Sequence, residues 1–480
     1  MVRLPHLIFL SLAVPLTMAL PAHADDRDEE LAQMKAAMQQ MSQTIQSLQH
    51  KVDALEKQKA PPARVAAPAS AAGPATKPVS SKPAAPGTAP NAAPTHPSVS
   101  DAKSILDTTP PIPHGYIAIP NTDVIFKIGG SARLDAIQDF GRNGNPNWFI
   151  PATIPVGPQK RFDDNTDHFV LHGKGSRLSV DVLRPGDDNH FHIYYENDFF
   201  GDSANSSLVY RVRHFYGEAW GVLAGHTFSN FMDIDVYPDL IDYEGPNGLV
   251  YVRQPQIRYT YPLADGHTKI AVAIENPNPL IDTDDSRLGT NSEVHHRFPD
   301  LTAHLRYDEP KWGHFQLSGV YRQLSYENEL RRDETNGWGV SASLGLNLSP
   351  RDSVQLQATY GEGIARYIQD PSVYNLDAGL DSAGSLHAIP VLAVSAGYTH
   401  HWSDRWRSTL TYSYAQVDPE FSNGPDSYRR SHYAAANLIY QSSSAVSFGL
   451  EYLYGLNELL DGNSAPAHRL DFVIKYDINK

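Results

Sequence analysis

The sequence has no cysteine among its 480 residues. This absence excludes disulfide-stapled scaffolds, thiol catalysis, and zinc or iron–sulfur sites that use cysteine ligands. After the first 24 residues the chain also lacks any uncharged apolar run of 18 residues, which excludes a membrane protein built from several transmembrane helices. Cationic residues are in deficit, because 39 Lys and Arg face 54 Asp and Glu, and the formal charge of −15 argues against nucleic acid as a partner.

The aromatic residues do not fit the rest of the composition. A mean hydropathy of −0.40 describes an acidic, water-soluble protein. The chain nevertheless has 25 Tyr and 6 Trp, with Tyr well ahead of the 17 Phe. Tyr and Trp are enriched where a side chain meets lipid at one end and water at the other, so their surplus indicates a membrane interface.

The first 24 residues predict an export signal, which is removed from the mature protein. Arg3 precedes the apolar stretch Leu7–Leu20, and Ala22-His23-Ala24 supplies a small-residue cleavage site before Asp25. A permanent membrane anchor is the weaker alternative, because the apolar stretch is shorter than a spanning helix needs.

Residues 25–59 predict a periplasmic helix that self-associates as a coiled coil. Apolar residues recur at alternating spacings of three and four, which is the a and d pattern of a heptad repeat. A lone amphipathic helix lying on its own domain is the alternative, but the narrow stripe favours oligomerisation. The mixed a and d residues do not decide between two and three strands. The seam consists of Leu31, Met34, Met38, Met41, Ile45, Leu48, Val52 and Leu55.

Residues 60–114 predict a linker rich in Ala and Pro. The 41 residues from Ala60 to Ser100 contain 10 Pro and 13 Ala. This composition favours extended, polyproline-like conformers and cannot bury a core. We expect the linker to hold the coiled coil away from the rest of the chain.

From residue 115 to residue 480 the hydrophobic pattern has a period of two. Within Gly337–Ser349, for example, Trp338 and Val340 alternate with Gly339 and Ser341. One apolar and one polar face per strand is the pattern of an outer-membrane barrel. Soluble β-sandwiches alternate in the same way, so the period alone does not distinguish the two folds.

The connections between the predicted strands favour the barrel. Seven short turns alternate with eight long loops, which demands about sixteen strands with both ends in the periplasm. We predict an all-β transmembrane barrel of antiparallel strands with an N-terminal α-helical coiled-coil stalk. The predicted turns are Arg184–Asp188, Gly217–Gly221, Leu263–His267, Glu309–Trp312, Ser349–Asp352, Ser403–Arg405 and Gln441–Ser444. The predicted loops are Gly141–Asp164, Gly201–Ser207, Phe231–Gly248, Asn276–Phe298, Asn328–Asn336, Glu362–His387, Asp418–Ser427 and Asn457–Ala465.

The inward face of such a barrel is its functional surface, and strand parity predicts which basic residues lie on it. Guanidinium groups in a row would lower the electrostatic barrier for an anion and bind carboxylates bidentately. Carboxylates occur on the same faces, so mutual neutralisation of these charges is the alternative. The predicted lumen residues are Arg133, Arg177, Arg258, Arg306, Arg322, Arg407, Arg469 and Lys475.

The loop after the fifth predicted strand, Phe231–Gly248, is rich in carboxylates. We expect it to fold into the lumen and form the constriction, with its carboxylates facing the wall arginines. An exposed acidic loop is the alternative, and a calcium site lacks the EF-hand spacing. The acidic residues of this loop are Asp233, Asp235, Asp239, Asp242 and Glu244.

Motifs for catalysis or metal binding are missing from the sequence. It has no G-x-S-x-G, no H-E-x-x-H and no P-loop, because Gly173-Lys174-Gly175-Ser176 lacks the upstream glycine spacing. The 21 His, including His295-His296 and His400-His401, fit a surface or interfacial role better than a metal site. We expect no enzyme activity, no metal and no cofactor.

Several stretches resemble the DcaP-like family of trimeric outer-membrane porins. The most specific is Val252-Arg253-Gln254-Pro255-Gln256-Ile257-Arg258-Tyr259, and Asp198-Phe199-Phe200-Gly201 and Phe231-Met232-Asp233 also match. The resemblance covers nearly the whole chain. It implies a homotrimer with an N-terminal periplasmic coiled coil and channels that favour negatively charged solutes such as dicarboxylates. In one departure, the chain continues from Tyr476 to Lys480 instead of finishing on an aromatic residue.

Taken together, the sequence predicts a passive outer-membrane porin for small hydrophilic anions. Its expected partners are outer-membrane lipid, copies of itself and small anionic solutes, and the coiled coil offers a contact with peptidoglycan. The alternative function is a structural tether between the outer membrane and peptidoglycan. Sixteen strands exceed what anchoring needs, since eight already form a filled barrel.

Overall fold

A computed structural model describes residues 112–157, 167–186, 190–201, 207–282, 293–327, 332–381, 384–418, 424 and 426–478. The expected signal peptide and coiled coil, and the linker as far as residue 111, lie outside the described residues. No helix in these ranges is long and apolar enough to cross a membrane.

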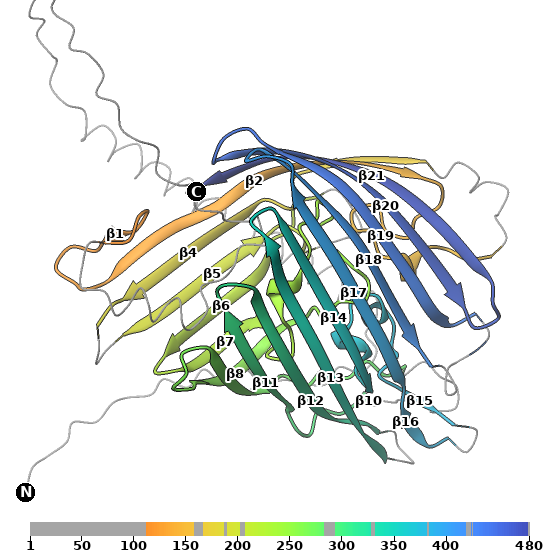
Figure 1. The fold of residues 1–480 in the computed structure, drawn as a ribbon. Coiled ribbons are helices and arrows are strands. Elements are labelled where there is room, and N and C mark those ends of the chain that lie inside the picture. Colours follow the sequence, from red (N-terminus) through yellow and green to blue (C-terminus); the bar gives the residue numbers. More distant parts are fainter. Residues whose placement is uncertain are drawn as a thin grey trace, which may run out of the picture. The chain divides into compact units, whose positions relative to one another are not determined.

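Sixteen antiparallel strands of the described chain close into a barrel, as predicted (Figure 1). Closure comes from the last strand, which pairs with the first from Gly130↔Ile478 to Phe140↔His468. Because lipid offers the backbone no hydrogen bonds, only a sheet without free edges is stable there. The barrel strands are β2 (Ile125–Phe140), β4 (Arg177–Arg184), β5 (Phe191–Asp198), β6 (Arg211–Ala219), β7 (Val222–Phe228), β8 (Arg253–Pro262), β9 (Thr268–Glu275), β11 (Asp300–Glu309), β12 (Gly313–Glu327), β13 (Arg332–Ser349), β14 (Asp352–Glu362), β17 (Pro390–His401), β18 (Trp406–Val417), β19 (Tyr428–Gln441), β20 (Val446–Leu459) and β21 (Ser464–Ile478).

Five shorter strands complete the described sheets. Three of them extend the barrel: β1 (Ile117–Ala118) and β3 (His168–His172) pair with β2, and β10 (Glu293–Val294) pairs with β12. The other two, β15 (Ala378–Leu380) and β16 (Leu386–Ala388), form a separate hairpin.

The seven predicted turns all lie at joints between consecutive barrel strands, but two predicted loops are mostly strand. Asn328–Asn336 was too long, because β13 already begins at Arg332, and Asn457–Ala465 shrinks to residues 460–463 between β20 and β21. Polar residues continue these strands by pairing across them, as Arg430 and Glu458 do at 2.7 Å. Polar residues therefore mark where a strand leaves the apolar layer of the membrane, whereas the strand itself continues beyond that point.

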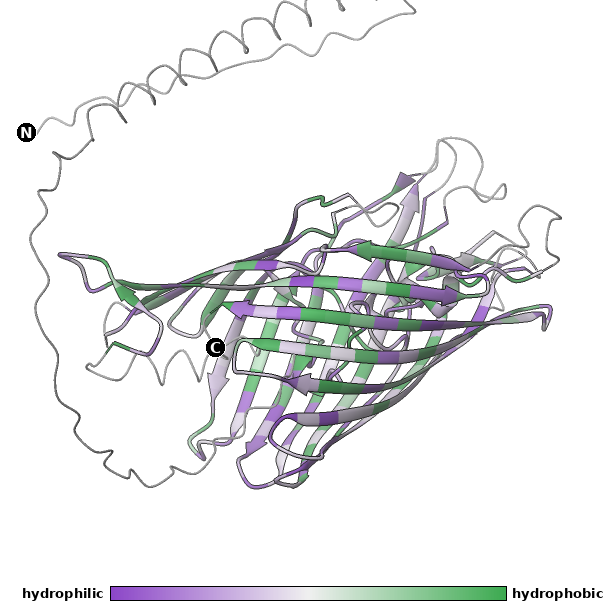
Figure 2. Ribbon diagram, turned by 90° about the horizontal axis from the view of Figure 1, so that it is seen from above, coloured by the Kyte–Doolittle hydropathy of each residue, from purple (hydrophilic) through white to green (hydrophobic). Residues whose placement is uncertain are grey.

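The two faces of the wall differ in polarity as the period of two predicts. On β13, the outward Trp338 and Val340 are 41% and 44% exposed, whereas the inward Ser341 and Ser343 are 2% and 4% exposed. Figure 2 shows the same alternation of hydrophobic and hydrophilic residues along the strands. Exposed aromatic rings lie near the short turns, among them Trp220, Tyr261, Trp402 and Trp406, as an interfacial girdle requires.

Three loops fold into the lumen, whereas the sequence analysis placed only one of them there. They are residues 141–157 after β2, residues 229–252 after β7 and residues 363–389 after β14, and together we call them the lumen plug. The second and third are joined by backbone hydrogen bonds from Tyr251 N to Tyr367 O (2.9 Å), Gln369 N to Leu249 O (3.1 Å) and Asp370 N to Asn247 O (3.0 Å). Short 3₁₀ turns shape the plug, namely η1 (Pro151–Thr153), η2 (Ile234–Val236), η3 (Ala365–Tyr367) and η4 (Pro371–Val373).

The lumen plug has a hydrophobic core of its own. Phe231, Tyr367 and Ile368 are completely buried. They belong to one apolar cluster with residues of the inner wall on β17 and β18, including Val391 and Val417. An apolar patch on the inside of a barrel has no lipid to face, so burying it beneath the loops stabilises the plug.

We predict that Ile368→Ala loosens the lumen plug. Ile368 is fully buried, and truncation of a buried Ile to Ala costs about 2–5 kcal/mol. The amides of Tyr251 and Gln369, which bond across the two loops, should then exchange hydrogen at least about tenfold faster. Hydrogen exchange followed by mass spectrometry measures this rate.

Ile257→Ala serves as the control, because Ile257 lies on the outer face of β8 and is 55% exposed. It should leave exchange in the plug unchanged. Equal exchange rates in Ile368→Ala and the unaltered protein would show that the loops do not depend on this core.

Candidate functional site

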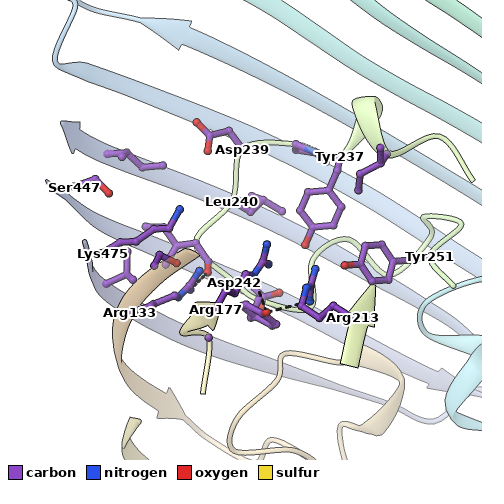
Figure 3. Close-up of a pocket in the computed structure, with 18 of the residues that line it drawn as sticks. Arg133, Arg177, Arg213, Tyr237, Asp239, Leu240, Asp242, Tyr251, Ser447 and Lys475 are labelled. Atoms are coloured by element: carbon purple, nitrogen blue, oxygen red, sulfur yellow. Dashed lines mark hydrogen bonds between the residues drawn. The ribbon is translucent and has the colours of Figure 1, made fainter. Parts of the chain in front are cut away.

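A narrow cavity lies in the lumen between the loop of residues 229–252 and one side of the barrel wall (Figure 3). Five cationic side chains line it, each from a different strand, and we call them the basic wall. Tyr237, Asp239 and Asp242 of the loop lie opposite them. The basic wall consists of Arg133 on β2, Arg177 on β4, Arg213 on β6, Arg407 on β18 and Lys475 on β21.

Strand parity places four of the five residues, and a β-bulge places the fifth. On β6 the ladder to β5 runs from Glu196↔His214 to Asn197↔Val212, so Arg213 is an extra residue without a partner. The bulge buries Arg213 and His214 side by side, with 3% and 0% exposed. Bulges re-aim side chains in this way near functional sites. Arg213 was missed because plain alternation from Phe215 assigns it to the lipid face.

Tyr243 of the loop lies among three guanidinium groups of the basic wall. The guanidinium carbons of Arg133, Arg177 and Arg213 are 5.4, 5.2 and 5.6 Å from the centre of its ring. Its hydroxyl accepts from Arg177 Nε (3.1 Å) and Arg213 Nη1 (3.0 Å) and donates to Asp198 (2.8 Å). The ring also stacks on Phe200 at 4.4 Å. Tyr243 therefore fixes where these three cations lie.

Each member of the basic wall also has a carboxylate partner. Arg133 pairs with Asp135 at 2.6 Å and Arg213 with Glu196 at 2.7 Å, and Arg177 lies 3.6 Å from Glu196. Arg407 pairs with Asp239 at 2.5 Å and Lys475 with Asp477 at 2.8 Å. The alternative of mutual neutralisation thus describes much of this wall, and a surplus of positive charge comes from carboxylates that two arginines share, such as Glu196, and from cations without a carboxylate partner.

Three other predicted lumen residues hold the loops in place and do not line the cavity. Arg469 donates to Asp139 and to the carbonyl of Asn145 (2.8 Å) in the first loop. Arg306 pairs with Asp233 and Asp235 in the second loop at 3.1 and 2.6 Å. Arg322 has 0% exposure.

Arg322 holds the third loop through two bonds. It donates to the carbonyl of Gly363 (2.6 Å) and to Asp377 (2.9 Å). Their bonds to the inward loops therefore distinguish these anchoring arginines from the basic wall, although strand parity treats both groups alike. The remaining predicted residue, Arg258, lies further along β8, where its charge acts on Glu218.

The carboxylates of the second loop mostly bind the wall directly and do not face it across an open gap. Asp233 accepts from His314 (2.9 Å) and Ser343 (2.5 Å) as well as Arg306. Asp242 accepts from Gly245 N (3.0 Å) and Tyr433 (3.2 Å). Of the five predicted residues, only Asp239 and Asp242 line the cavity. The expected arrangement, in which the loop carboxylates face the wall arginines across the constriction, therefore holds only in part.

The contacts of Asp233 also decide whether this part of the loop could bind a metal ion. Ligand atoms of Asp233, Asp235 and His314 lie within 4.8 Å of one another. Arg306 donates to both carboxylates, so a guanidinium already supplies the positive charge that a cation would bring. This group is an ion-paired anchor of the loop.

Two loop carboxyls carry less negative charge at neutral pH than their number suggests. Burial, reinforced by the nearby Asp242, raises the pKa of Glu244 to about 7. Burial also raises the pKa of Asp370 to about 7, although Ser431 and the amide of Ala152 hydrogen-bond to its carboxylate. Protonation of these two groups shifts the balance of the lumen toward positive charge.

Comparison with known proteins identifies relatives of the described barrel. A family model described as DcaP outer membrane protein matches residues 115–478. Among solved structures, the outer membrane channel DcaP of Acinetobacter baumannii is 23% identical, with a TM-score of 0.65 over 75% of this chain and 99% of that chain. Comparison with curated proteins finds no match.

Two more distant structures also align with the barrel. OmpT of Vibrio cholerae is 12% identical over 75% of this chain and 99% of that chain, with a TM-score of 0.44. An anion-selective porin from Comamonas acidovorans is 11% identical over 74% of this chain and 100% of that chain, with a TM-score of 0.46. Solved structures at such identities indicate a shared fold at most, and they do not identify a solute.

We predict that the folded barrel becomes less stable as the pH rises from about 5 to about 7.5. Glu244 and Asp370 keep their protons in the folded state up to about pH 7, whereas an unfolded chain loses them near pH 4. The folded state therefore binds more protons in this window, and the free energy of unfolding falls by at most about 1.4 kcal/mol per pH unit for each carboxyl. Urea unfolding in detergent at several pH values measures the slope.

Asp370→Asn removes one of these two loop carboxyls and should make the slope shallower. Asp233 does not interfere, because His314 and Arg306 oppose the effect of burial and hold its pKa low. An unchanged slope in Asp370→Asn would contradict the assignment.

Proposed function

This chain belongs to the family of DcaP outer membrane proteins, and on that premise we propose that it is a passive diffusion channel for small hydrophilic anions. The outer-membrane barrel follows from the family and from the described fold. The preference for anions is our proposal, and the basic wall supports it more than any other feature.

The lumen plug directs a solute past the basic wall. Three loops with a shared core occupy the barrel interior, so a solute has to pass beside them. The cavity on that route presents Arg133, Arg177, Arg213, Arg407 and Lys475. Guanidinium groups offer paired donors that match a carboxylate, and dicarboxylates are the solutes that the family resemblance implies.

The carboxylates near the route are less available to attract cations. Asp239 is ion-paired with Arg407, and Asp242 accepts three hydrogen bonds. Glu244 is protonated to a large extent near neutral pH because its pKa is raised to about 7. The N–H donors of the basic wall thus remain on the route. The carboxylate oxygens nearby are already bound by cations or hydrogen-bond donors, or carry a proton.

We extend the proposal to the rest of the chain from its sequence. Residues 1–24 act as a signal peptide, residues 25–59 form a periplasmic coiled coil, and residues 60–114 link it to the barrel of residues 115–480. The heptad seam supports a homotrimer, as does the resemblance to trimeric porins. We propose that the coil also contacts peptidoglycan.

A structural tether between outer membrane and peptidoglycan is the second candidate, and the lumen plug favours it in one respect. A barrel filled by its own loops can serve as an anchor without conducting. Purified protein in planar bilayers separates the two functions, because a tether gives no channel current.

We predict that the protein in planar bilayers is permeable to chloride in preference to potassium, and that Arg213→Gln reduces this preference by about threefold or more. The substitution takes from Glu196 and Asp198 a cation that lies 2.7 and 3.0 Å away, so the local positive charge falls by one unit. The reversal potential in a potassium chloride gradient measures the preference.

The exposed turn residue Arg405 provides a matched control, and Arg405→Gln should leave the reversal potential unchanged. Potassium preference in the unaltered protein would overturn the proposed function.

A further inference from the structure

Arginines inside the barrel are paired with carboxylates almost without exception. In the described ranges, Arg133, Arg177, Arg211, Arg213, Arg306, Arg322, Arg366, Arg407 and Arg469 each lie within 4.0 Å of a carboxylate oxygen. A buried charge without a partner is destabilising, so this pairing is expected. Arg253 and Arg258 depart from it, since neither makes an ion pair with another described residue.

The two exceptions differ in their surroundings. Arg258 pairs with Leu223 in the ladder, and Leu223 pairs with Glu218 on the next strand, so a carboxylate lies two strands away in the same row. Arg253 begins β8, directly after the loop, and the cations Arg213 and Arg211 act on it. The charge of Arg253 also acts on the carboxyl of Glu244.

The guanidinium of Arg253 has one buried edge and one open edge. Its Nη1 atom is buried and has no hydrogen-bond partner in the described chain. Nε and Nη2 are not among the buried atoms without a partner, and the side chain forms no hydrogen bond with another described residue. The Nε–Nη2 edge is therefore accessible, and its two parallel N–H groups are the ones that bind a carboxylate bidentately.

An aromatic ring places this open edge beside the solute route. The guanidinium carbon of Arg253 lies 5.8 Å from the centre of the Tyr251 ring. Tyr251 itself lines the cavity together with Arg213 (Figure 3). A carboxylate on Arg253 would thus sit next to the basic wall, with a flat apolar surface beside its carbon atoms.

The charge around Arg253 is positive even after its neighbours are paired. Arg177, Arg211, Arg213 and Arg253 bring four positive charges, whereas Glu196 and Asp198 bring two negative ones. Glu244 is the remaining acid, and its pKa of about 7 means that it neutralises only part of the surplus near neutral pH. An anion that enters the route therefore meets its strongest uncompensated attraction here.

We propose that Arg253 and Tyr251 form a carboxylate-binding site for the solute, at the end of the basic wall where the loop returns to β8. This inference rests on the proposed function, since it assigns the anion a resting place in that channel. The planar fork favours a carboxylate over a spherical anion, and the flat apolar ring of Tyr251 favours an organic anion over inorganic phosphate.

The test measures block of the chloride current by succinate in planar bilayers. We expect succinate to reduce the current of the unaltered protein with an apparent binding constant that Arg253→Gln weakens at least tenfold. Arg253→Lys keeps the charge but loses the fork, and it should weaken block by a factor between those of Gln and Arg. The exposed turn variant Arg351→Gln should leave block within about twofold of the unaltered protein.

The outcomes separate this inference from the proposed function. A channel that prefers chloride but shows the same succinate block in Arg253→Gln and the unaltered protein would overturn the site and leave the function standing. Potassium preference, or no current, would overturn the function itself. Inorganic phosphate that blocks the unaltered protein as strongly as succinate would overturn the carboxylate assignment.

Folding is checked before either variant is compared. Heat-dependent mobility on a denaturing gel shows whether each barrel has formed. If Arg253→Gln does not fold, the comparison of Arg253→Lys with the unaltered protein decides, and equal block in these two would again overturn the site.

Discussion

The pairing of lumen arginines with carboxylates and carbonyls is the interaction on which the rest of the structure depends. In a region that excludes bulk water, such pairs hold only when the geometry is good and further hydrogen bonds are made. Arg469, Arg306 and Arg322 each satisfy this condition by binding a different inward loop. The wall and the lumen plug are therefore one electrostatic unit, and the cavity is the space that this arrangement leaves.

The barrel could be predicted from the sequence because its determinants are local. A period of two and the alternation of turns with loops follow from neighbouring residues, and they gave sixteen strands correctly. Two loop boundaries were wrong because charged residues pair across strands that continue beyond the apolar layer, as Arg430 and Glu458 do on β19 and β20 and Glu327 and Arg332 do on β12 and β13. The stalk and linker remain predictions, since they lie outside the described residues.

The site could be predicted only in part because its determinants are not local. Parity identified Arg133, Arg177, Arg407 and Lys475 but could not separate them from Arg322 and Arg469, whose burial depends on loops far away in the sequence. Strand parity did not predict Arg213 in the lumen because a β-bulge turns its side chain to the opposite face of the strand. One signal for the inward third loop was present: Val391 and Ala393 put apolar residues on an inner face that is polar in other strands.

The backbone bonds between the second and third loops have a further consequence. Elements that share a core and a ladder of bonds separate together or not at all, since breaking one contact exposes the others. The narrow part of this channel is thus a cooperative element. Its width should change in discrete, all-or-none steps, as a two-state unit does, and gradual widening by one swinging loop is incompatible with its construction.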